Sequence, residues 1–310
     1  MDSLHQIIGH LNRSHSAFHA IAEAENELKE AGFAQIFEQQ PFHLELGKSY
    51  YIKRNGSSLI AFRLPKGDFT GFKIAASHSD SPTFKLKHNP YFVQSGYKAL
   101  RVEPYGGMIM STWFDRPLSI AGRILVESQG KIASSLFDID EDFAVIPNLC
   151  IHFNRDINEG HSFNPDKEIV PIFGVEEAGF DWATYLKGKA NLEEGDNILD
   201  EDLFLYSREK ARLVGQNEEF LCAGRLDNLT SAFTSVLAII EASANGDIPM
   251  VAIFDNEEVG SGSRHGANGD FLDVILGRIC EEFGKKKEET LSRSFLLSIV
   301  NAHAKHPNYP

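Results

Sequence analysis

Two adjacent glutamates, Glu257 and Glu258, are the residues of this sequence whose type and position most clearly allow chemistry. They come just after the apolar, strand-like run 251–254 and shortly before Gly260. A strand therefore carries carboxylates to its tip. Because ligands bind at the carboxyl ends of strands in α/β sheets, the two glutamates are candidates for metal ligation and proton transfer. For any single Glu-Glu pair the alternative is a solvated turn.

Two other segments place possible ligands beside regular structure. His78 and Asp80 follow the strand-like run 71–77. Residues two apart in an extended chain point the same way, so both can share one site in which Asp80 orients the imidazole; a polar loop is the alternative. Asp227 comes directly before the helix-periodic stretch 228–242. There it is either a metal ligand or an ordinary helix N-cap, and the residues alone leave both open.

Taken together, these positions offer one imidazole, four carboxylates and no thiolate. Such a donor set suits zinc, manganese or cobalt, and the excess of carboxylates suits a two-metal site with a bridging aspartate. In a pair of neighbouring glutamates, one carboxylate can hold an ion while the other remains available as general base. The set consists of His78, Asp80, Asp227, Glu257 and Glu258.

The elements that must position these residues indicate an α/β fold. Apolar residues recur at helical spacing over 14–31, where Ser16 is the expected N-cap and Gly32 the terminating glycine. The middle of the chain instead consists of short β-like runs between turns. We therefore expect one α/β domain, interrupted by a β-rich insert. Its expected ranges are 1–92 and 216–310, with the insert at 93–215.

Further elements are predicted from local signals. Asn55 and Gly56 lie between two apolar-rich runs and predict a β-hairpin. A lysine-rich helix is expected near 272–289, and 294–300 is expected to be one more buried strand.

Composition narrows the class of protein. Among 310 residues, 44 acidic and 30 basic side chains give a formal net charge of −14, which argues against a nucleic-acid or anionic-membrane partner. We expect neither a cleaved leader nor a membrane span, because no sufficiently long apolar run occurs. The three cysteines are widely separated and odd in number, so they are expected to be buried thiols of a cytoplasmic protein.

Six segments in sequence order resemble the successive signatures of the aspartyl aminopeptidase family of dinuclear zinc aminopeptidases. Together they span nearly the whole chain, and six ordered matches are far more specific than any one of them. The segments are His78-Ser79-Asp80-Ser81-Pro82, Thr112-Trp113-Phe114-Asp115-Arg116, Ile151-His152-Phe153-Asn154-Arg155, Gly224-Arg225-Leu226-Asp227-Asn228-Leu229, Asp255-Asn256-Glu257-Glu258-Val259-Gly260-Ser261 and Asn301-Ala302-His303-Ala304-Lys305-His306-Pro307-Asn308.

The resemblance implies a role for each candidate residue. His78 would ligate one zinc, Asp227 would bridge two zinc ions and Glu258 would ligate the second. Glu257 would be the general base, and Asp80 would orient His78. The implied reaction is hydrolysis of the N-terminal residue, possibly an acidic one, from peptides.

The resemblance also implies how the chain is organised and assembled. The implied fold is a mixed-sheet zinc-peptidase catalytic domain interrupted by a β-rich dimerisation domain. His152, in the insert, matches a histidine that reaches the active site of the neighbouring subunit. The family assembles as a homo-oligomer built on dimers, a dodecamer, so the expected partners are peptide substrates and further copies of the chain.

Two departures from the family pattern lead to an alternative function. Val300 stands where the family has a zinc-ligand aspartate, and the chain is expected to be truncated before the last histidine ligand. Loss of ligands weakens metal binding. The alternative is therefore a catalytically impaired or inactive member that acts as an assembly or binding subunit. A third possibility is a metal-free α/β binding protein whose carboxylates lie on the surface.

Overall fold

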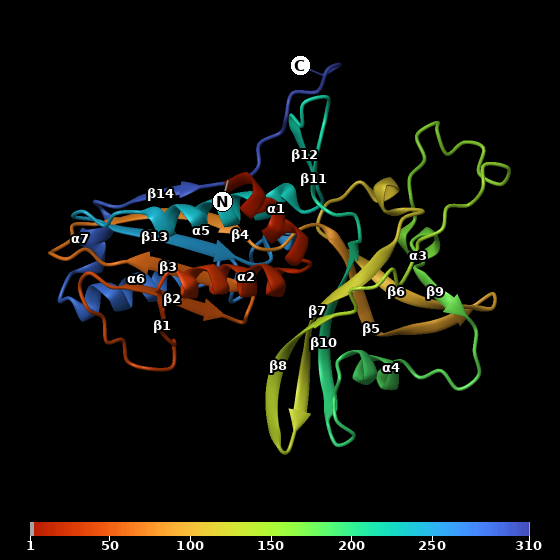
Figure 1. Ribbon diagram of the computed structural model, residues 1–310, viewed down its shortest axis with the longest axis horizontal. Helices are drawn as coiled ribbons and strands as arrows, with labels where there is room; N and C mark the ends of the chain where they lie inside the picture. The colour runs from red at the N-terminus through yellow and green to blue at the C-terminus, as the bar shows by residue number, and fades with distance from the viewer. Residues whose placement is uncertain (1–2, 310) are drawn as a thin grey trace. The chain divides into compact units, whose positions relative to one another are not determined.

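The computed structural model describes residues 3–309 and divides the chain into two compact units (Figure 1). The first unit comprises Met1–Ser81 and Ala211–Pro310, and the second comprises Pro82–Lys210. Outside the described range lie the outermost residues of the expected domains, Met1, Asp2 and Pro310.

The second unit begins at Pro82, before the expected boundary at residue 93. The reason is that its first strand, β5 (Thr83–Gln94), pairs with β10 and β6 of the same unit. It ends at Lys210, before the expected residue 215, because the short strand β11 (Arg212–Val214) pairs with β12 (Phe220–Cys222) in the first unit.

The first unit is built on a mixed six-stranded sheet (Figure 1). The Asn55-Gly56 turn joins two antiparallel strands, as the sequence predicts. The central strand β13 runs antiparallel to β3 and parallel to β4, which makes the sheet mixed. In sheet order the strands are β1 (Ala34–Gln35), β2 (Ser49–Arg54), β3 (Ser58–Arg63), β13 (Ile248–Phe254), β4 (Phe72–His78) and β14 (Phe295–Ser298).

Helices cover this sheet through two apolar cores. One core joins the sheet to α1, α2 and α5, with Leu28 and Phe233 at its centre. The other joins the opposite set of strand side chains to α6 and α7, with Phe271 and Ile279 fully buried. Alternation of side chains along the strands supplies both faces. The helices are α1 (Ser3–Arg13), α2 (Ala17–Glu30), α5 (Leu226–Glu241), α6 (Phe271–Glu282) and α7 (Lys287–Leu291).

Two helical predictions meet different outcomes. Helix α2 starts after Ser16, whose hydroxyl accepts the amide hydrogen of His19, and it ends just before Gly32 at φ +80°, as predicted. The single helix expected near 272–289 is instead two helices, α6 and α7. Gly284 lies between them at φ +63°, a conformation that glycine adopts without steric cost.

The prediction that 294–300 forms a buried strand is wrong about burial. Strand β14 forms there, but Phe295, Leu296 and Leu297 are 64%, 48% and 51% exposed. The physical reason is its position, because β14 is the last strand of the sheet and, among residues 3–309, pairs only with β4.

The second unit is β-rich, with an antiparallel six-stranded sheet (Figure 1). Side chains of Trp182 and Leu186 from α4 (Trp182–Lys189) pack into its core, and Ile169 follows the short helix α3 (Pro165–Glu168). A 3₁₀ turn spans Met110–Trp113. In sheet order the strands are β8 (Lys131–Asp138), β7 (Leu118–Ser128), β10 (Asn197–Ser207), β5 (Thr83–Gln94), β6 (Tyr97–Tyr105) and β9 (Ile172–Val175).

The burial of the cysteines differs in part from the prediction. All three thiols are free, but only Cys280 is buried, so the expectation of burial is wrong for Cys150 and Cys222. Cys222 is on the short hairpin strand β12, where its side chain faces solvent. Among residues 3–309, no helix combines the length and apolar character needed to cross a bilayer.

Candidate metal centre

The site forms where two parallel neighbours, β4 and β13, end side by side. Their register pairs His78 with Phe254, so the residues that follow Phe254 leave the sheet beside the imidazole. This adjacency joins segments that are far apart in the chain. It brings His78 and Asp80 together with Glu257 and Glu258, as expected for ligands at the carboxyl ends of parallel strands.

His78 presents its two ring nitrogens to different groups. Its side chain is only 4% exposed, and Nδ1 lies 3.3 Å from the carboxylate of Asp80 and 3.1 Å from the carbonyl oxygen of the same residue. On the other side, Nε2 lies 3.6 Å from Asp227 Oδ1 and 3.8 Å from Glu257 Oε2. The ring therefore has one nitrogen held by Asp80 and the other directed at carboxylates.

The charge around His78 alters its protonation. Burial lowers the pKa of the imidazole, but the hydrogen bond and charge of Asp80, and then the charges of Glu257 and Asp227, outweigh burial. The net result is a raised pKa, so the positively charged ring is favoured while no cation competes for the carboxylates.

Asp80 has a second role that the sequence does not reveal. Its side chain is 3% exposed, and its two oxygens accept the backbone amide hydrogens of Glu257, at 3.2 Å, and Glu258, at 3.1 Å. One buried carboxylate thus touches His78 and also fixes the backbone of both glutamates. The only sequence signal for this role is an aspartate directly after a strand, which is too common to be specific.

Glu257 and Glu258 lie in a one-turn 3₁₀ helix, Glu257–Val259, that reverses the chain after β13. Asn256 at φ +60° and Gly260 at φ +98° flank this turn. Left-handed backbone is tolerated by asparagine and adopted freely by glycine, which explains why these residue types occur at these positions. The turn leaves the Glu257 side chain 51% exposed while Glu258 is partly buried.

The partly buried carboxyl of Glu258 has a raised pKa. Burial raises its pKa first, and the negative charges of Asp80, Glu257 and Asp227 raise it further, against an opposing effect of His78. The pKa reaches about 7. A carboxyl in this condition holds a proton that a cation can displace.

Asp227 approaches the site from the start of α5. The stretch assigned to this helix begins at Leu226, but regular helical backbone starts only after Asn228, so Asp227 lies just before the regular helix, as the sequence predicts, and its role as metal ligand or N-cap stays a prediction. The backbone of Asp227 is not helical, with φ −81° and ψ +113°, and its carbonyl oxygen accepts a hydrogen bond from the Ser81 hydroxyl at 2.8 Å. Its carboxylate, about half exposed, faces His78.

Part of the donor set comes close to the spacing that one metal ion requires. His78, Glu257 and Glu258 each offer one ligand atom, and these atoms lie within 4.8 Å of one another. Zinc binds nitrogen and oxygen at about 2.0–2.2 Å, so two ligands of one ion are at most about 4.4 Å apart. Small side-chain adjustments close the difference. The group includes Glu257, which the resemblance assigns to proton transfer rather than ligation.

Asp80 and Asp227 adjoin this group without belonging to it, and two other residues singled out from the sequence lie elsewhere. His152 is exposed in the second unit, in a turn closed by the hydrogen bond from the Phe153 amide to the Cys150 carbonyl. Val300 follows β14 in the first unit, where Ser298 pairs with Ala76 and the Ile299 amide donates to the Ala76 carbonyl. The strand ends at Ser298, and Val300, 54% exposed, follows two residues later, as His78 follows two residues after Ala76.

The α/β fold carries a histidine and several carboxylates at the carboxyl ends of two strands of its mixed sheet. These features place the protein among candidate metal-dependent hydrolases. The model of the family described as aminopeptidase I zinc metalloprotease (M18) matches residues 10–310. The chain therefore belongs to the M18 family. This assignment confirms the predicted resemblance to aminopeptidases, and the family is one of zinc metalloproteases.

Individual relatives agree with this assignment. A "Probable M18 family aminopeptidase 2" from Clostridium acetobutylicum is 41% identical over 314 residues, which cover 98% of this chain and 72% of the relative. The Ape4 of a cryo-EM complex of Ape4 and Nbr1 is similar with a TM-score of 0.92 and 36% identity, over 99% of this chain and 64% of that chain. The S. cerevisiae mApe1 dodecamer has a TM-score of 0.85 and 26% identity, over 100% and 74%.

Proposed function

We propose that this chain is a metalloaminopeptidase that hydrolyses the N-terminal residue of peptides at a two-zinc site. The observation that carries the proposal is that the carboxylates of Asp227, Glu257 and Glu258 lie close to the imidazole of His78 in a chain of the M18 family. Since the chain spans 72% of the C. acetobutylicum relative, the activity is proposed for the part of the fold that it contains.

His78, Asp227 and Glu258 would hold the metal. His78 offers Nε2, because Asp80 holds Nδ1, and the hydrogen bond at Nδ1 fixes the ring orientation. Asp227 has a carboxylate with two oxygens, which suits a bridge between two ions. When bound, zinc would polarise the scissile carbonyl and make water more acidic.

Glu257 would act as the general base. Its half-exposed carboxylate can reach solvent, while its backbone amide is held by Asp80 at 3.2 Å. A base needs this combination of a fixed backbone and access to the water whose proton it takes. The same carboxylate can then return the proton to the leaving amine.

Three further proposals concern specificity, assembly and location. An acidic N-terminal residue is the proposed preference, from the resemblance to aspartyl aminopeptidases. We propose a homo-oligomer, with the second unit as dimerisation domain and His152 reaching the site of a neighbouring subunit, since mApe1 forms a dodecamer. The cytoplasm is the proposed compartment, because all three thiols are free.

The test pairs zinc content with turnover. Purified chain is analysed for zinc and assayed for release of the first residue from peptides that start with Asp, Glu or Leu. Glu257→Gln should keep the metal and lose turnover about 10²–10⁴-fold, while Glu30→Gln at the end of α2 serves as a matched control. Equal turnover of E257Q and E30Q would remove Glu257 from the mechanism.

One observation favours a second candidate, an impaired or inactive member that serves assembly. Ser298 pairs with Ala76, so the same register continued by two residues would bring position 300 alongside His78, where an aspartate would add a carboxylate to the site and valine adds none. An oligomeric, folded chain without zinc and without turnover would support this candidate. Two zinc ions per chain together with turnover would exclude it.

A further inference from the structure

The chain that follows the two glutamates of the metal centre forms a compact loop, residues 261–270, without helix or strand. The Asn268 amide donates to the Ser261 carbonyl at 3.2 Å, which closes the loop on itself. A Cβ atom at Gly266 would lie 2.4 Å from the same Ser261 oxygen, and one at Gly269 would lie 2.7 Å from another carbonyl oxygen of the loop. Because the backbone packs this closely, a displacement of one part of the 261–270 loop is passed to the rest.

The 261–270 loop contacts the backbone before and after the 3₁₀ turn of the metal centre, Glu257–Val259. Before this turn, the Asp255 amide donates to the His265 carbonyl at 3.3 Å. After the turn, Asn268 Nδ2 donates to the Gly260 carbonyl at 3.4 Å. Both ends of the turn that carries the two glutamates are therefore attached to the loop.

Arg54, the last residue of β2, holds the 261–270 loop from the neighbouring hairpin. Its Nη1 donates to the Arg264 carbonyl at 2.9 Å and to the carboxylate of Asp270. Its Nε lies 3.0 and 3.2 Å from the two carboxylate oxygens of Glu38, and its Cζ lies 4.5 Å from the ring centre of Phe271. A planar fork of five donors can hold these groups together, whereas a lysine ammonium is a single compact charge.

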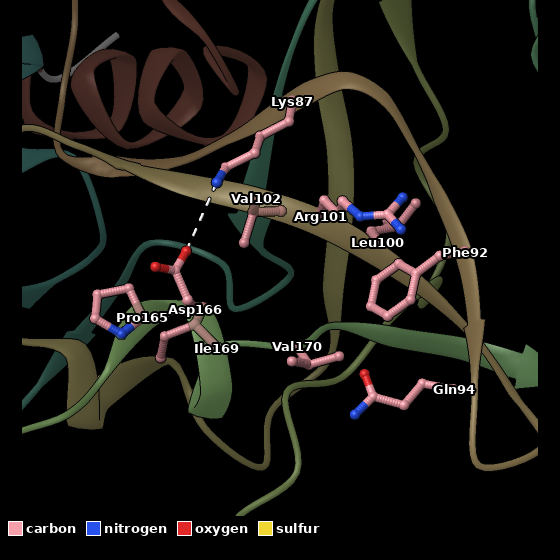
Figure 2. A pocket seen from close by; sticks show the side chains of 10 residues that line it. All are labelled: Lys87, Phe92, Gln94, Leu100, Arg101, Val102, Pro165, Asp166, Ile169 and Val170. Carbon is pink, nitrogen blue, oxygen red and sulfur yellow. Dashed lines mark ion pairs between the residues drawn. The ribbon is translucent and has the colours of Figure 1, made fainter.

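Burial distinguishes Arg54 from charged side chains on the surface. Figure 2 shows a surface pair of the second unit, in which Lys87 Nζ lies 3.7 Å from Asp166 Oδ1 and the two side chains are 39% and 84% exposed. Exposed pairs of this kind contribute little to stability. The side chain of Arg54 is only 5% exposed and that of Glu38 only 13%, so removing the guanidinium would deprive a poorly solvated carboxylate and a loop carbonyl of this donor.

The hairpin formed by β2 and β3 is itself fixed at the edge of the sheet where the metal centre lies. In the sheet, β3 adjoins β13, and β13 adjoins β4. Ser58, at the start of β3, donates its hydroxyl hydrogen to the His265 carbonyl of the loop at 2.7 Å. Ser79, the residue between the imidazole and the aspartate of the site, has its hydroxyl 2.7 Å from the Ser57 carbonyl and 3.1 Å from the Phe254 carbonyl. The hairpin therefore offers a fixed support for the loop.

We propose that Arg54 is a positioning residue of the metal centre. It fixes the 261–270 loop against the hairpin, and the loop in turn fixes the backbone that presents the Glu257 and Glu258 carboxylates. Asp80 holds the amides of the same two glutamates, so the turn is fixed from two segments of the chain. The expected effects on zinc affinity and turnover rest on the proposed function, whereas the expected effect on the backbone does not.

The test compares Arg54→Lys with Arg63→Lys as a matched control. Arg63 is the last residue of β3 in the same hairpin, and its guanidinium makes contacts of the same kinds. It lies 4.9 Å from the ring centre of Phe33 and donates to the carbonyls of Ile239, at 2.8 Å, and Ile240. Both substitutions keep the positive charge and remove the planar fork, so both should lower the resistance to urea. The comparison thus separates a local role of Arg54 from a general loss of stability.

Hydrogen exchange of the metal-free protein measures the effect on the backbone. R54K should speed the exchange of amides in the segment 255–262 about tenfold or more, while R63K should leave this segment at the parent rate. In competition with a chelator, R54K should bind zinc about tenfold or more weakly than R63K does. In peptide turnover, R54K should lower kcat about tenfold or more and leave KM within about twofold, because a misplaced base affects the chemical step more than substrate binding.

Two results would overturn the proposal. One is equal exchange of the segment 255–262 in R54K and R63K, whether or not the parent turns over peptides. The other is faster exchange in R54K with a zinc affinity and a kcat equal to those of R63K, because the loop would then not position the carboxylates. A parent chain without zinc and without turnover would refute the proposed function alone, and exchange would then decide about Arg54.

A second variant keeps the test decisive if R54K does not fold. Asp270→Ala removes one partner of Arg54 at a side chain that is 65% exposed, so the fold should tolerate it. D270A should speed exchange of the segment 255–262 about twofold or more. An unchanged exchange rate in D270A would count against Arg54 as the anchor of the loop.

Discussion

Asp80→Asn is the substitution that most sharply tests how the metal centre is built. In the parent chain, the buried carboxylate accepts the amide hydrogens of Glu257 and Glu258 and lies 3.3 Å from His78 Nδ1. Asparagine keeps one acceptor oxygen and replaces the other by an NH₂ donor. At least one backbone amide then faces a donor and loses its partner in a buried position.

The loss of at least one hydrogen-bond acceptor sets the expected change in stability. A buried polar group without a partner costs about 1–3 kcal/mol, so the free energy of unfolding of D80N should fall by about that amount. Loss of a group that orients metal ligands typically weakens metal affinity about 10–100-fold. We expect zinc affinity to drop within this range, because at least one glutamate amide loses its partner and the imidazole loses the charge of Asp80.

Protons compete with zinc for His78 and Glu258, and D80N weakens this competition, which would raise the zinc affinity. The choice of pH separates this effect from the loss of ligand orientation. Asp80 raises the pKa of both His78 and Glu258, so its removal lowers both pKa values and eases deprotonation of the ligands. At pH 8, above the pKa of about 7 of Glu258, the benefit from this carboxyl is small. The measurement is therefore a zinc titration against a competing chelator at pH 8, with urea unfolding alongside.

Asp255→Asn provides the matched control. Asp255 is also buried at the end of β13, accepts the Asn256 amide hydrogen at 2.7 Å and lies 3.6 Å from His265. The D255N variant should lose stability as D80N does, but it should keep more of its zinc affinity. If D80N binds zinc within about twofold of the parent, or if D255N loses as much affinity as D80N, Asp80 does not organise the site.

Four more predictions use other features of the first unit. In the metal-free protein, the folded pKa of Glu258 lies above its ordinary 4.5, so its stabilising effect at low pH should be lost as pH rises through about 7. Unfolding measured against pH should show this loss in the parent and not in Glu258→Gln. Zinc binding should correspondingly release protons near neutral pH, measurable by calorimetry in two buffers. Phe233→Ala, in the core of α5 and stacked on His10, should cost about 3–5 kcal/mol in urea unfolding. Val300→Asp should increase zinc affinity if position 300 lies beside His78, and unchanged affinity would contradict that register.

Local sequence signals predict much of the first unit. The Asn55-Gly56 hairpin, the caps of α2 and the strands before His78 and Glu257 follow from turn chemistry and apolar runs, and each forms as predicted. Where the prediction fails, the deciding factor is position in the sheet. The run 294–300 has the composition of a buried strand, yet β14 is an edge strand, and strand order cannot be derived from composition.

The candidate site shows the same limit. Each ligand type is visible at the end of its own element, but the contact between Asp80 and the amides of Glu257 and Glu258 joins residues 177 and 178 positions apart. It exists because β4 and β13 are adjacent, although the whole second unit and α5 separate them in sequence. A motif can suggest which residues act, whereas only the strand order shows which residue holds the others.

The electrostatics of the site argue that a cation belongs there. Asp80, Asp227, Glu257 and Glu258 surround a single imidazole, and like charges at such distances repel. Without a metal the site reduces this repulsion by holding protons, which is what the raised pKa values of His78 and Glu258 describe. If these buried and half-buried acids served only the fold, neutral residues in their place would make the folded state more stable, because the repulsion between them would be gone. Their convergence is costly unless a divalent cation offsets it, and Glu257, the more exposed of the two glutamates at the strand tip, is the one that the proposed function assigns to proton transfer.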